Sequence, residues 1–203
     1  VLGDLGEYHE SETLYREALQ MKRVVLGDIH PEIALGLNNI AYALTDQKKY
    51  DEAASMYRQA IAMQHKLLGD DHPDIAAALN NLAFVLHDKG DAEGARRMMQ
   101  QSLDMYRRTV GPEHPSIARG MGNQAMWQME AGDYATAEPL LREALQMRRK
   151  LLGNEHTDVA GTLTGYSGNP KNGVTRKSVY LGVAHGGQGI IKKADPVGTT
   201  PDA

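Results

Sequence analysis

The chain has 203 residues and a formal net charge of −4, which disfavours nucleic-acid binding because proteins of that class present basic surfaces. It has no cysteine, so disulfide bonds are excluded, and it has no apolar run of about 18 residues that would cross a membrane. Because no basic-then-apolar leader is present either, we expect a cytoplasmic protein that binds neither membrane nor nucleic acid. The chain begins at Val1 within a structural unit, so we interpret it as a fragment of a longer protein.

The first predicted elements are helices. Residues 2–6 are predicted to end one helix, and residues 8–26 carry apolar side chains at steps of three and four along one face of the next. Gly27 then ends this helix. His30-Pro31 begins another, with proline at the first helical position, where its missing N–H costs nothing.

Three helix pairs follow, at about 32–68, 74–110 and 116–152, and we call the two members of a pair helix A and helix B. They repeat with a period of 42 residues, marked by His30, His72, His114 and His156, by Gly27, Gly69, Gly111 and Gly153, and by Asn39, Asn81 and Asn123. Small residues also recur, at Ala41, Ala83 and Ala125 of helix A and at Ala53, Ala95 and Ala137 of helix B. The repeat predicts an all-α solenoid of antiparallel helix pairs, in which each unit packs on its neighbours.

The pattern ends near Gly161, where a fourth helix A has just begun at Thr157. We therefore divide the chain into a repeat array, 1–164, and a tail, 165–203, with eight Gly, three Pro and a net charge of +3. This composition predicts a non-helical tail, and the two apolar runs around His185 leave a β-hairpin as one interpretation. The tail either covers the open end of the array or lies in the groove of the acidic repeats.

The alternation of small and large positions resembles the tetratricopeptide repeat (TPR). The 42-residue length, the doubled asparagine and the Leu-Gly-x-x-His-Pro connector resemble its kinesin-light-chain-like subclass, over about residues 2–164. The resemblance implies a right-handed superhelical solenoid with a concave groove lined by the A helices. It further implies that Asn39, Asn81 and Asn123 contact ligand peptides, for which an amide supplies two donors and an acceptor.

Further groove positions have two interpretations each. Asn38 and Asn80 are weaker ligand-binding candidates, since Gly122 interrupts their row. Tyr42 and Phe84 either form apolar ligand pockets or pack between repeats, and Arg119 either pairs with an acidic ligand group or is a surface charge. All the asparagines share one alternative, in which they bridge adjacent A helices without touching a ligand.

No catalytic, cofactor or metal site is predicted. Equivalent histidines of successive repeats should lie roughly 10 Å apart, whereas zinc holds its ligands at about 2 Å, so the histidines are interpreted as connector residues near helix N-caps. Nucleophile-elbow, P-loop and zinc-protease motifs are missing. The predicted function is non-enzymatic binding of a protein or peptide in the groove of the A helices. The alternative is an oligomerisation spacer that self-associates through its terminal helices or its tail.

Overall fold

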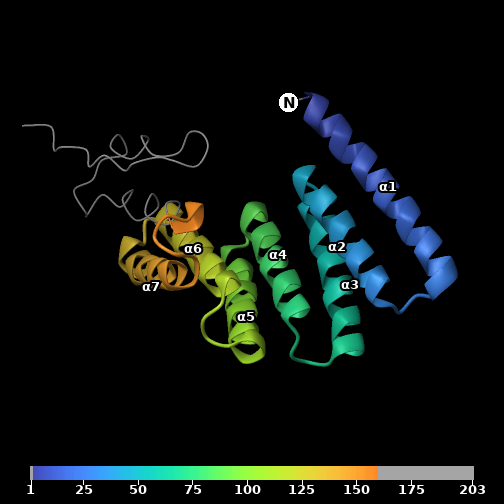
Figure 1. Ribbon diagram of the computed structural model, residues 1–203. Coiled ribbons are helices and arrows are strands. Elements are labelled where there is room, and N and C mark those ends of the chain that lie inside the picture. The colour runs from blue at the N-terminus through green and yellow to red at the C-terminus, as the bar shows by residue number, and fades with distance from the viewer. Residues whose placement is uncertain (1, 160–203) are drawn as a thin grey trace, which may run out of the picture. The chain divides into compact units, whose positions relative to one another are not determined.

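The structure, a computed structural model, describes residues 2–159, with side chains from His9 onward. Every regular element in this range is an α-helix (Figure 1). The helices are α1 (Leu2–Leu26), α2 (Pro31–Asp46), α3 (Tyr50–Leu68), α4 (Pro73–Lys89), α5 (Ala92–Val110), α6 (Pro115–Glu130) and α7 (Tyr134–Leu152), and residues 157–159 begin another. The predicted all-α repeat fold is confirmed.

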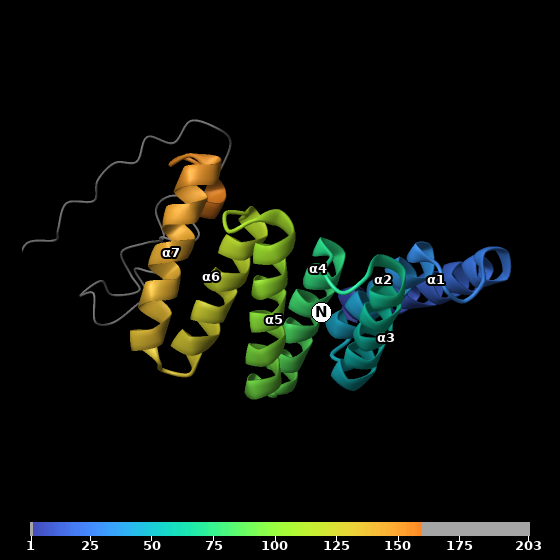
Figure 2. The same cartoon turned by 90° about the horizontal axis from the view of Figure 1, so that it is seen from below.

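The chain forms two compact units, Val1–Gln124 and Ala125–Ala203. In the first unit each helix packs on the next one along the chain: α1 on α2, α2 on α3, α3 on α4, and α4 on α5 (Figures 1 and 2). Packing between sequence neighbours is the arrangement expected of stacked repeats, because each repeat buries its apolar face against the adjacent one.

Small residues allow these helices to approach closely. Ala41 of α2 and Ala53 of α3 are fully buried, as are their equivalents in the next repeat, Ala83 and Ala95. A Cβ atom added at Gly36 of α2 would lie 2.9 Å from the Leu19 Cδ1 of α1, closer than atoms pack. The recurring small residues of the sequence are therefore the contact points of the helices.

The core also accommodates a polar residue at a position where the preceding repeat has alanine. Ser102 of α5 occupies the position of Ala60 in α3, and both side chains are buried. The Ser102 hydroxyl donates a 2.6 Å hydrogen bond to the carbonyl of Ala76 in α4. This bond satisfies the buried hydroxyl and links the two helices.

The second unit repeats this packing on a smaller scale. Ala125 from the end of α6 and Ala137 and Leu141 from α7 are buried together, with Met129 and Leu140 against them. The turn between the two helices ends at Asp133, whose carboxylate accepts a hydrogen bond from the Thr136 amide and caps α7. The aspartate that follows the turn glycine is therefore the N-cap of α7.

The repeated histidines are N-caps. In each case the ring Nδ1 accepts the backbone N–H two residues further on, at 3.1–3.2 Å, for His30, His72, His114 and His156. The proline after the first three of them occupies the first helical position and needs no N–H acceptor. The interpretation of these histidines as connector residues is confirmed.

Glycines end the B helices because the backbone there has a conformation that other residues avoid. Gly69 has φ 84° and ψ −168°, and Gly111 has φ 89° and ψ 171°, a region essentially restricted to glycine. The turns within pairs need positive φ as well, at Gly90 and Gly132, and at Lys48 in the first complete pair. Lys48, with φ 61°, is the single non-glycine residue with positive φ among those described.

One helix boundary differs from its prediction. The chain is helical without interruption from Leu2 to Leu26, so the prediction that residues 2–6 end a separate helix is wrong. Gly3 and Gly6 suggested that break. A glycine inside a helix costs about 1 kcal/mol relative to alanine, but unlike proline it keeps its N–H bond and does not stop the helix.

Glu12 ties α1 to the turn between α2 and α3. Its buried carboxylate accepts hydrogen bonds from Arg16 at 2.8 Å, Gln47 at 2.8 Å and Lys49 at 3.1 Å. Burial by itself raises the pKa of Glu12, but the hydrogen bonds from Arg16, Gln47 and Lys49 outweigh it and lower that pKa from 4.5 to about 2. The carboxylate is therefore most stable in its charged form when the chain is folded.

Several sequence predictions lie outside the described residues. They concern the Gly-rich tail 165–203, its hairpin, its two proposed locations, and the extent of the fourth helix A beyond Val159. The division of the chain at residue 165 stays a prediction. In the described part of the chain, no helix combines the length and the apolar character needed to cross a membrane.

Replacing Lys48 with glycine is expected to raise the free energy of unfolding by about 1 kcal/mol, because a left-handed conformation costs a side-chain-bearing residue about 1–2 kcal/mol. Urea denaturation measures the change. Lys66→Gly, at an exposed site inside α3, is the matched control and should lower stability by about 1 kcal/mol. Equal losses in both variants would contradict the assignment of strain to Lys48.

The lowered pKa of Glu12 predicts acid sensitivity. The group is held charged in the folded chain, so its contribution is complete above pH 4.5 and is lost as the pH falls toward about 2. Glu12→Gln should cost about 1–3 kcal/mol at pH 7, and its difference from the wild type should shrink as the pH falls through this window. Denaturation at several pH values measures this, with exposed Glu10→Gln as the control that should show no difference.

Candidate functional site

A cavity of about 360 Å³ opens between the two A helices α2 and α4, above the end of α3. Helix α2 contributes Pro31, Glu32, Ala34, Leu35 and Asn38, helix α4 contributes Asp74, Ala77, Ala78 and Asn81, and α3 contributes Gln64, Leu67 and Leu68. All twelve residues belong to the first compact unit. We call this cavity the A-helix pocket.

Helical spacing explains why these residues meet. On each A helix the lining residues recur at steps of three or four, which places them on one face. Small side chains, such as Ala34, Ala77 and Ala78, leave the space between the helices open, while Leu35 is 49% exposed at its edge. The pocket thus combines an apolar wall with a few polar groups, as ligand sites commonly do.

Two amide oxygens of the A-helix pocket are buried without a hydrogen-bond partner. They are the Oδ1 of Asn38 and the Oε1 of Gln64, and the Gln64 residue is only 8% exposed. A buried acceptor left unsatisfied costs about 1–3 kcal/mol. A ligand that supplies N–H donors to these oxygens would recover that cost.

Comparison between repeats shows that Gln64 is exceptional. Its equivalents all have partners: Lys22 donates to Glu32 at 2.7 Å, Tyr106 stacks on the His114 ring at 6.0 Å, and Arg148 donates to the Asp158 carbonyl at 2.8 Å. In these three repeats the position connects the end of helix B to the start of the following helix A. Within residues 2–159, Gln64 makes no such bond.

Carboxylates lie where the A helices begin. Glu32 is paired with Lys22, and the hydrogen bond from that ammonium group holds the pKa of Glu32 below its usual range. Asp74 lies in the first turn of α4 with its side chain exposed. The pocket therefore offers mainly acceptors, so a group that donates hydrogen bonds or carries positive charge fits it best.

The predicted asparagines lie as follows. Asn39 and Asn123 are half-buried and have no hydrogen-bond partner in the part of the chain that the structure describes. Asn81 is exposed, lines the A-helix pocket, and accepts a 3.4 Å hydrogen bond from Asn80, which is buried. The structure brings Asn81 together with Asn38, the residue ranked lower from the sequence.

The remaining predicted residues differ in exposure. Tyr42 is 63% exposed, Phe84 is half-buried, and Arg119 is exposed with no ion pair within residues 2–159. None of these placements shows ligand contact, so the role of each in binding stays a prediction. Sequence reasoning missed Gln64. The only signal was its difference from Lys22, Tyr106 and Arg148 at the same position of the repeat.

Comparison with known proteins supports the repeat fold. The family model described as tetratricopeptide repeat matches residues 1–66, 32–108 and 74–150. No curated protein sequence matches the chain significantly.

Among solved structures, the chain is similar to BtubC (BKLC) from P. vanneervenii, with a TM-score of 0.72 and 19% identity, over 93% of this chain and 82% of that one. It is also similar to the nearly identical TPR-like repeats of a kinesin light chain from Podosopora anserina, with a TM-score of 0.66 and 23% identity, over 80% of this chain and 77% of that one. A single-substitution variant of those repeats has a TM-score of 0.67. These structures show the fold, and they confirm its likeness to kinesin-light-chain-type repeats.

Proposed function

Because this chain belongs to the tetratricopeptide repeat family, whose repeats generally mediate protein–protein interaction, we propose that it binds an extended peptide segment of a partner protein in the A-helix pocket. The observation that supports this proposal is the pair of buried, unpartnered amide oxygens of Asn38 and Gln64 in that pocket. The proposed role is non-enzymatic and needs no cofactor, and we place it in the cytoplasm.

An extended peptide has the chemistry that the pocket requires. Each of its residues carries one backbone N–H donor and one carbonyl acceptor, repeated every 3.3 Å or so. The donors suit the oxygens of Asn38 and Gln64, and the Asn81 amide can hold a carbonyl. Leu35, Leu67 and the alanines then surround an apolar side chain of the peptide.

The asparagines outside the pocket extend the same surface. Asn39 and Asn123 have no hydrogen-bond partner within residues 2–159, so their amides are available to a longer ligand. We propose that they bind further peptide groups along the A helices of the first unit. The cost of fixing a flexible peptide is offset by several such bonds acting together, because each one contributes only about 1 kcal/mol.

Peptides selected from a random library displayed on phage, with the full chain as bait, test the proposal. We expect selected peptides to bind with Kd values that Asn39, Asn81 and Asn123→Ala raise about fivefold each, the equivalent of about 1 kcal/mol per bond. Gln64→Met should weaken binding similarly while preserving or raising Tm, because it removes an unsatisfied buried oxygen. Isothermal titration calorimetry measures the Kd values and scanning calorimetry the Tm values.

Two results separate binding from a structural role. Asn154→Ala, an exposed asparagine after α7, is the matched control and should leave both Kd and Tm unchanged. If the asparagine-to-alanine variants melt at a much lower temperature yet bind the peptides as the wild type does, these asparagines bridge helices and the proposal is wrong. A library that yields no peptide binding to the wild type would contradict it equally.

A second candidate function, self-association, is favoured by the exposed apolar face of α1. Met21 and Val25 are 70% and 80% exposed, and Tyr15 is 38% exposed, whereas its equivalent in the first complete pair, Tyr57, is 2% exposed. In the first complete pair, helix A (α2) covers the Tyr57 side of α3. Within residues 2–159 no helix covers the corresponding side of α1. We propose as the alternative that α1 of a second copy covers it, in a symmetric contact between equal surfaces.

Light scattering across a concentration range tests this alternative. The wild type should form dimers as concentration rises, and Val25→Glu should shift the midpoint upward at least about tenfold, since it buries a charge in the contact. Ser55→Glu, on an exposed face of α3, controls for the added charge. A chain that stays monomeric throughout would exclude self-association through α1.

A further inference from the structure

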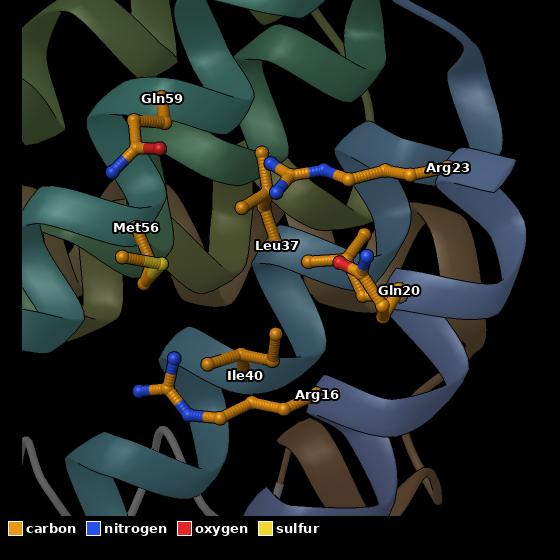
Figure 3. Close-up of a pocket in the computed structure, with 8 residues that line it drawn as sticks. Arg16, Gln20, Arg23, Leu37, Ile40, Met56 and Gln59 are labelled. Atoms are coloured by element: carbon orange, nitrogen blue, oxygen red, sulfur yellow. The ribbon is translucent and has the colours of Figure 1, made fainter. Parts of the chain in front are cut away.

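The opposite side of the first unit, formed by the B helices, has cavities of its own. One of about 250 Å³ lies between α1 and α3, with α2 beneath it (Figure 3). It is lined by Arg16, Leu19, Gln20, Arg23, Leu37, Ile40, Met56 and Gln59. We call it the first B-helix pocket.

This pocket recurs one repeat later. The eight positions 42 residues further on all line a second cavity, of about 600 Å³, between α3 and α5 above α4. They are Arg58, Ile61, Ala62, His65, Leu79, Leu82, Met98 and Gln101. Two pockets with equivalent linings in consecutive repeats indicate a feature of the repeat itself, so we call this one the second B-helix pocket.

Both pockets combine an apolar floor with cationic walls. In the first, Arg16 and Arg23 extend from α1 over Ile40 and Leu37, toward Met56 and Gln59 of α3 (Figure 3). No carboxylate is part of the pocket lining, although Arg16 donates to Glu12 at 2.8 Å and lies 3.9 Å from Glu52, so Arg23 is the cation most available to a ligand.

The second pocket carries a more mixed charge. Arg58, the equivalent of Arg16, has no ion-pair or hydrogen-bond partner within residues 2–159. Asp104 is the one acidic residue in its lining, and Arg107 already pairs with it at 2.9 Å. Arg58 is therefore available to a ligand.

An equivalent nitrogen is left unsatisfied in each pocket. The Nε of Arg23 and the Nδ1 of His65 occupy the same position of the repeat, and both are buried without a hydrogen-bond partner. The carboxylates of Asp28 and Asp70 lie 3.7 and 3.6 Å away, beyond hydrogen-bond length. Buried nitrogens that make only such long ion-pair contacts and no hydrogen bond are rare in proteins, and a carboxylate is the acceptor that satisfies an arginine most strongly.

We propose that the two B-helix pockets bind successive acidic side chains of one extended acidic segment of a partner protein. Arg23 holds a carboxylate in the first pocket, and Arg58 holds one in the second. Neighbouring repeats are offset by about 10 Å, which an extended chain covers in about three residues. The segment therefore has Asp or Glu at every third position, with apolar side chains between them against Leu37, Leu79 and the methionines.

The second unit contains the same elements on α7. Arg142, Leu145, Gln146 and Arg149 line a cavity there and correspond to Arg16, Leu19, Gln20 and Arg23 of α1. Helix α5 departs from the pattern, with Gln100 and Asp104 in place of the first arginine and the glutamine. The arrangement is thus a property of particular B helices rather than of all of them.

A labelled peptide tests the proposal on the full chain. The probe is fluorescein-labelled Glu-Leu-Ser repeated four times, and the control peptide has Gln in place of Glu. We expect anisotropy titrations to show binding of the acidic probe alone, weakened several-fold between about 50 and 200 mM salt because the contacts are ionic. Arg23→Gln with Arg58→Gln should lower its affinity at least about tenfold.

Three comparisons make this result specific. Arg96→Gln removes the same charge from an exposed site of α5 outside both pockets and should change the affinity less than about twofold. Arg23→Lys keeps the charge but loses the forked donor pair, so it should retain only part of the binding. Asn81→Ala should leave this probe's binding unchanged, because the A-helix pocket is a separate site.

The proposal is overturned if the double variant, with an unchanged Tm, binds the acidic probe as the wild type does. It is overturned equally if the Gln peptide binds as tightly, or if Arg96→Gln weakens binding as much as the double variant. Because Arg58 has no partner within the described residues, Arg58→Gln alone gives a second variant that keeps the fold. Loss of binding to this variant supports the proposal. If Arg58→Gln and Arg23→Gln, each made singly, both bind the probe as the wild type does, the proposal is contradicted.

Discussion

The close approach of helices at small residues is the constraint on which the structure depends. Alanines of helices A and B are fully buried at equivalent positions of the repeats, and glycines such as Gly36 and Gly120 leave no room for a Cβ, which would lie 2.8–2.9 Å from a leucine of the neighbouring helix. Because these contacts recur every 42 residues, they determine the direction in which the remaining side chains of each helix point. The residues outside these contacts differ between repeats, and they include Gln64 of the A-helix pocket and Arg23 and Arg58 of the B-helix pockets.

The fold was predictable because its signals are local and repeated. His30 and its equivalents with the following prolines mark helix starts, Gly69 and its equivalents mark helix ends, and the small residues mark contacts. The error at residues 2–6 arose where Gly3 and Gly6 had to be interpreted without a cap or a proline beside them. A helix tolerates such a glycine at a modest cost, so composition alone does not locate a boundary there.

The candidate site was less predictable, for a physical reason. Asn81 is exposed, but two helices stacked side by side place different positions of the repeat opposite each other. Asn38 of α2 therefore lines the A-helix pocket with Asn81 of α4, rather than Asn39, its equivalent in the repeat. Gln64 belongs to helix B. It differs from its equivalents because its amide oxygen has no hydrogen-bond partner, which only the three-dimensional structure can show.

Two adjacent positions of the repeat hold buried side-chain atoms that have no hydrogen-bond partner. The atoms at these two positions face different surfaces of the first unit. Gln64 is unsatisfied toward the A helices, and the adjacent position holds Arg23 in α1 and His65 in α3, both unsatisfied toward the B helices. Each such atom costs folding free energy of about 1–3 kcal/mol, whereas Lys22 and Tyr106, the equivalents of Gln64, avoid that cost with a partner. A chain with a net stability of about 5–15 kcal/mol retains several such costs most readily where a ligand removes them. The ends of α1 and α3 thus contain Arg23, His65 and Gln64, whose unsatisfied atoms support the two binding proposals.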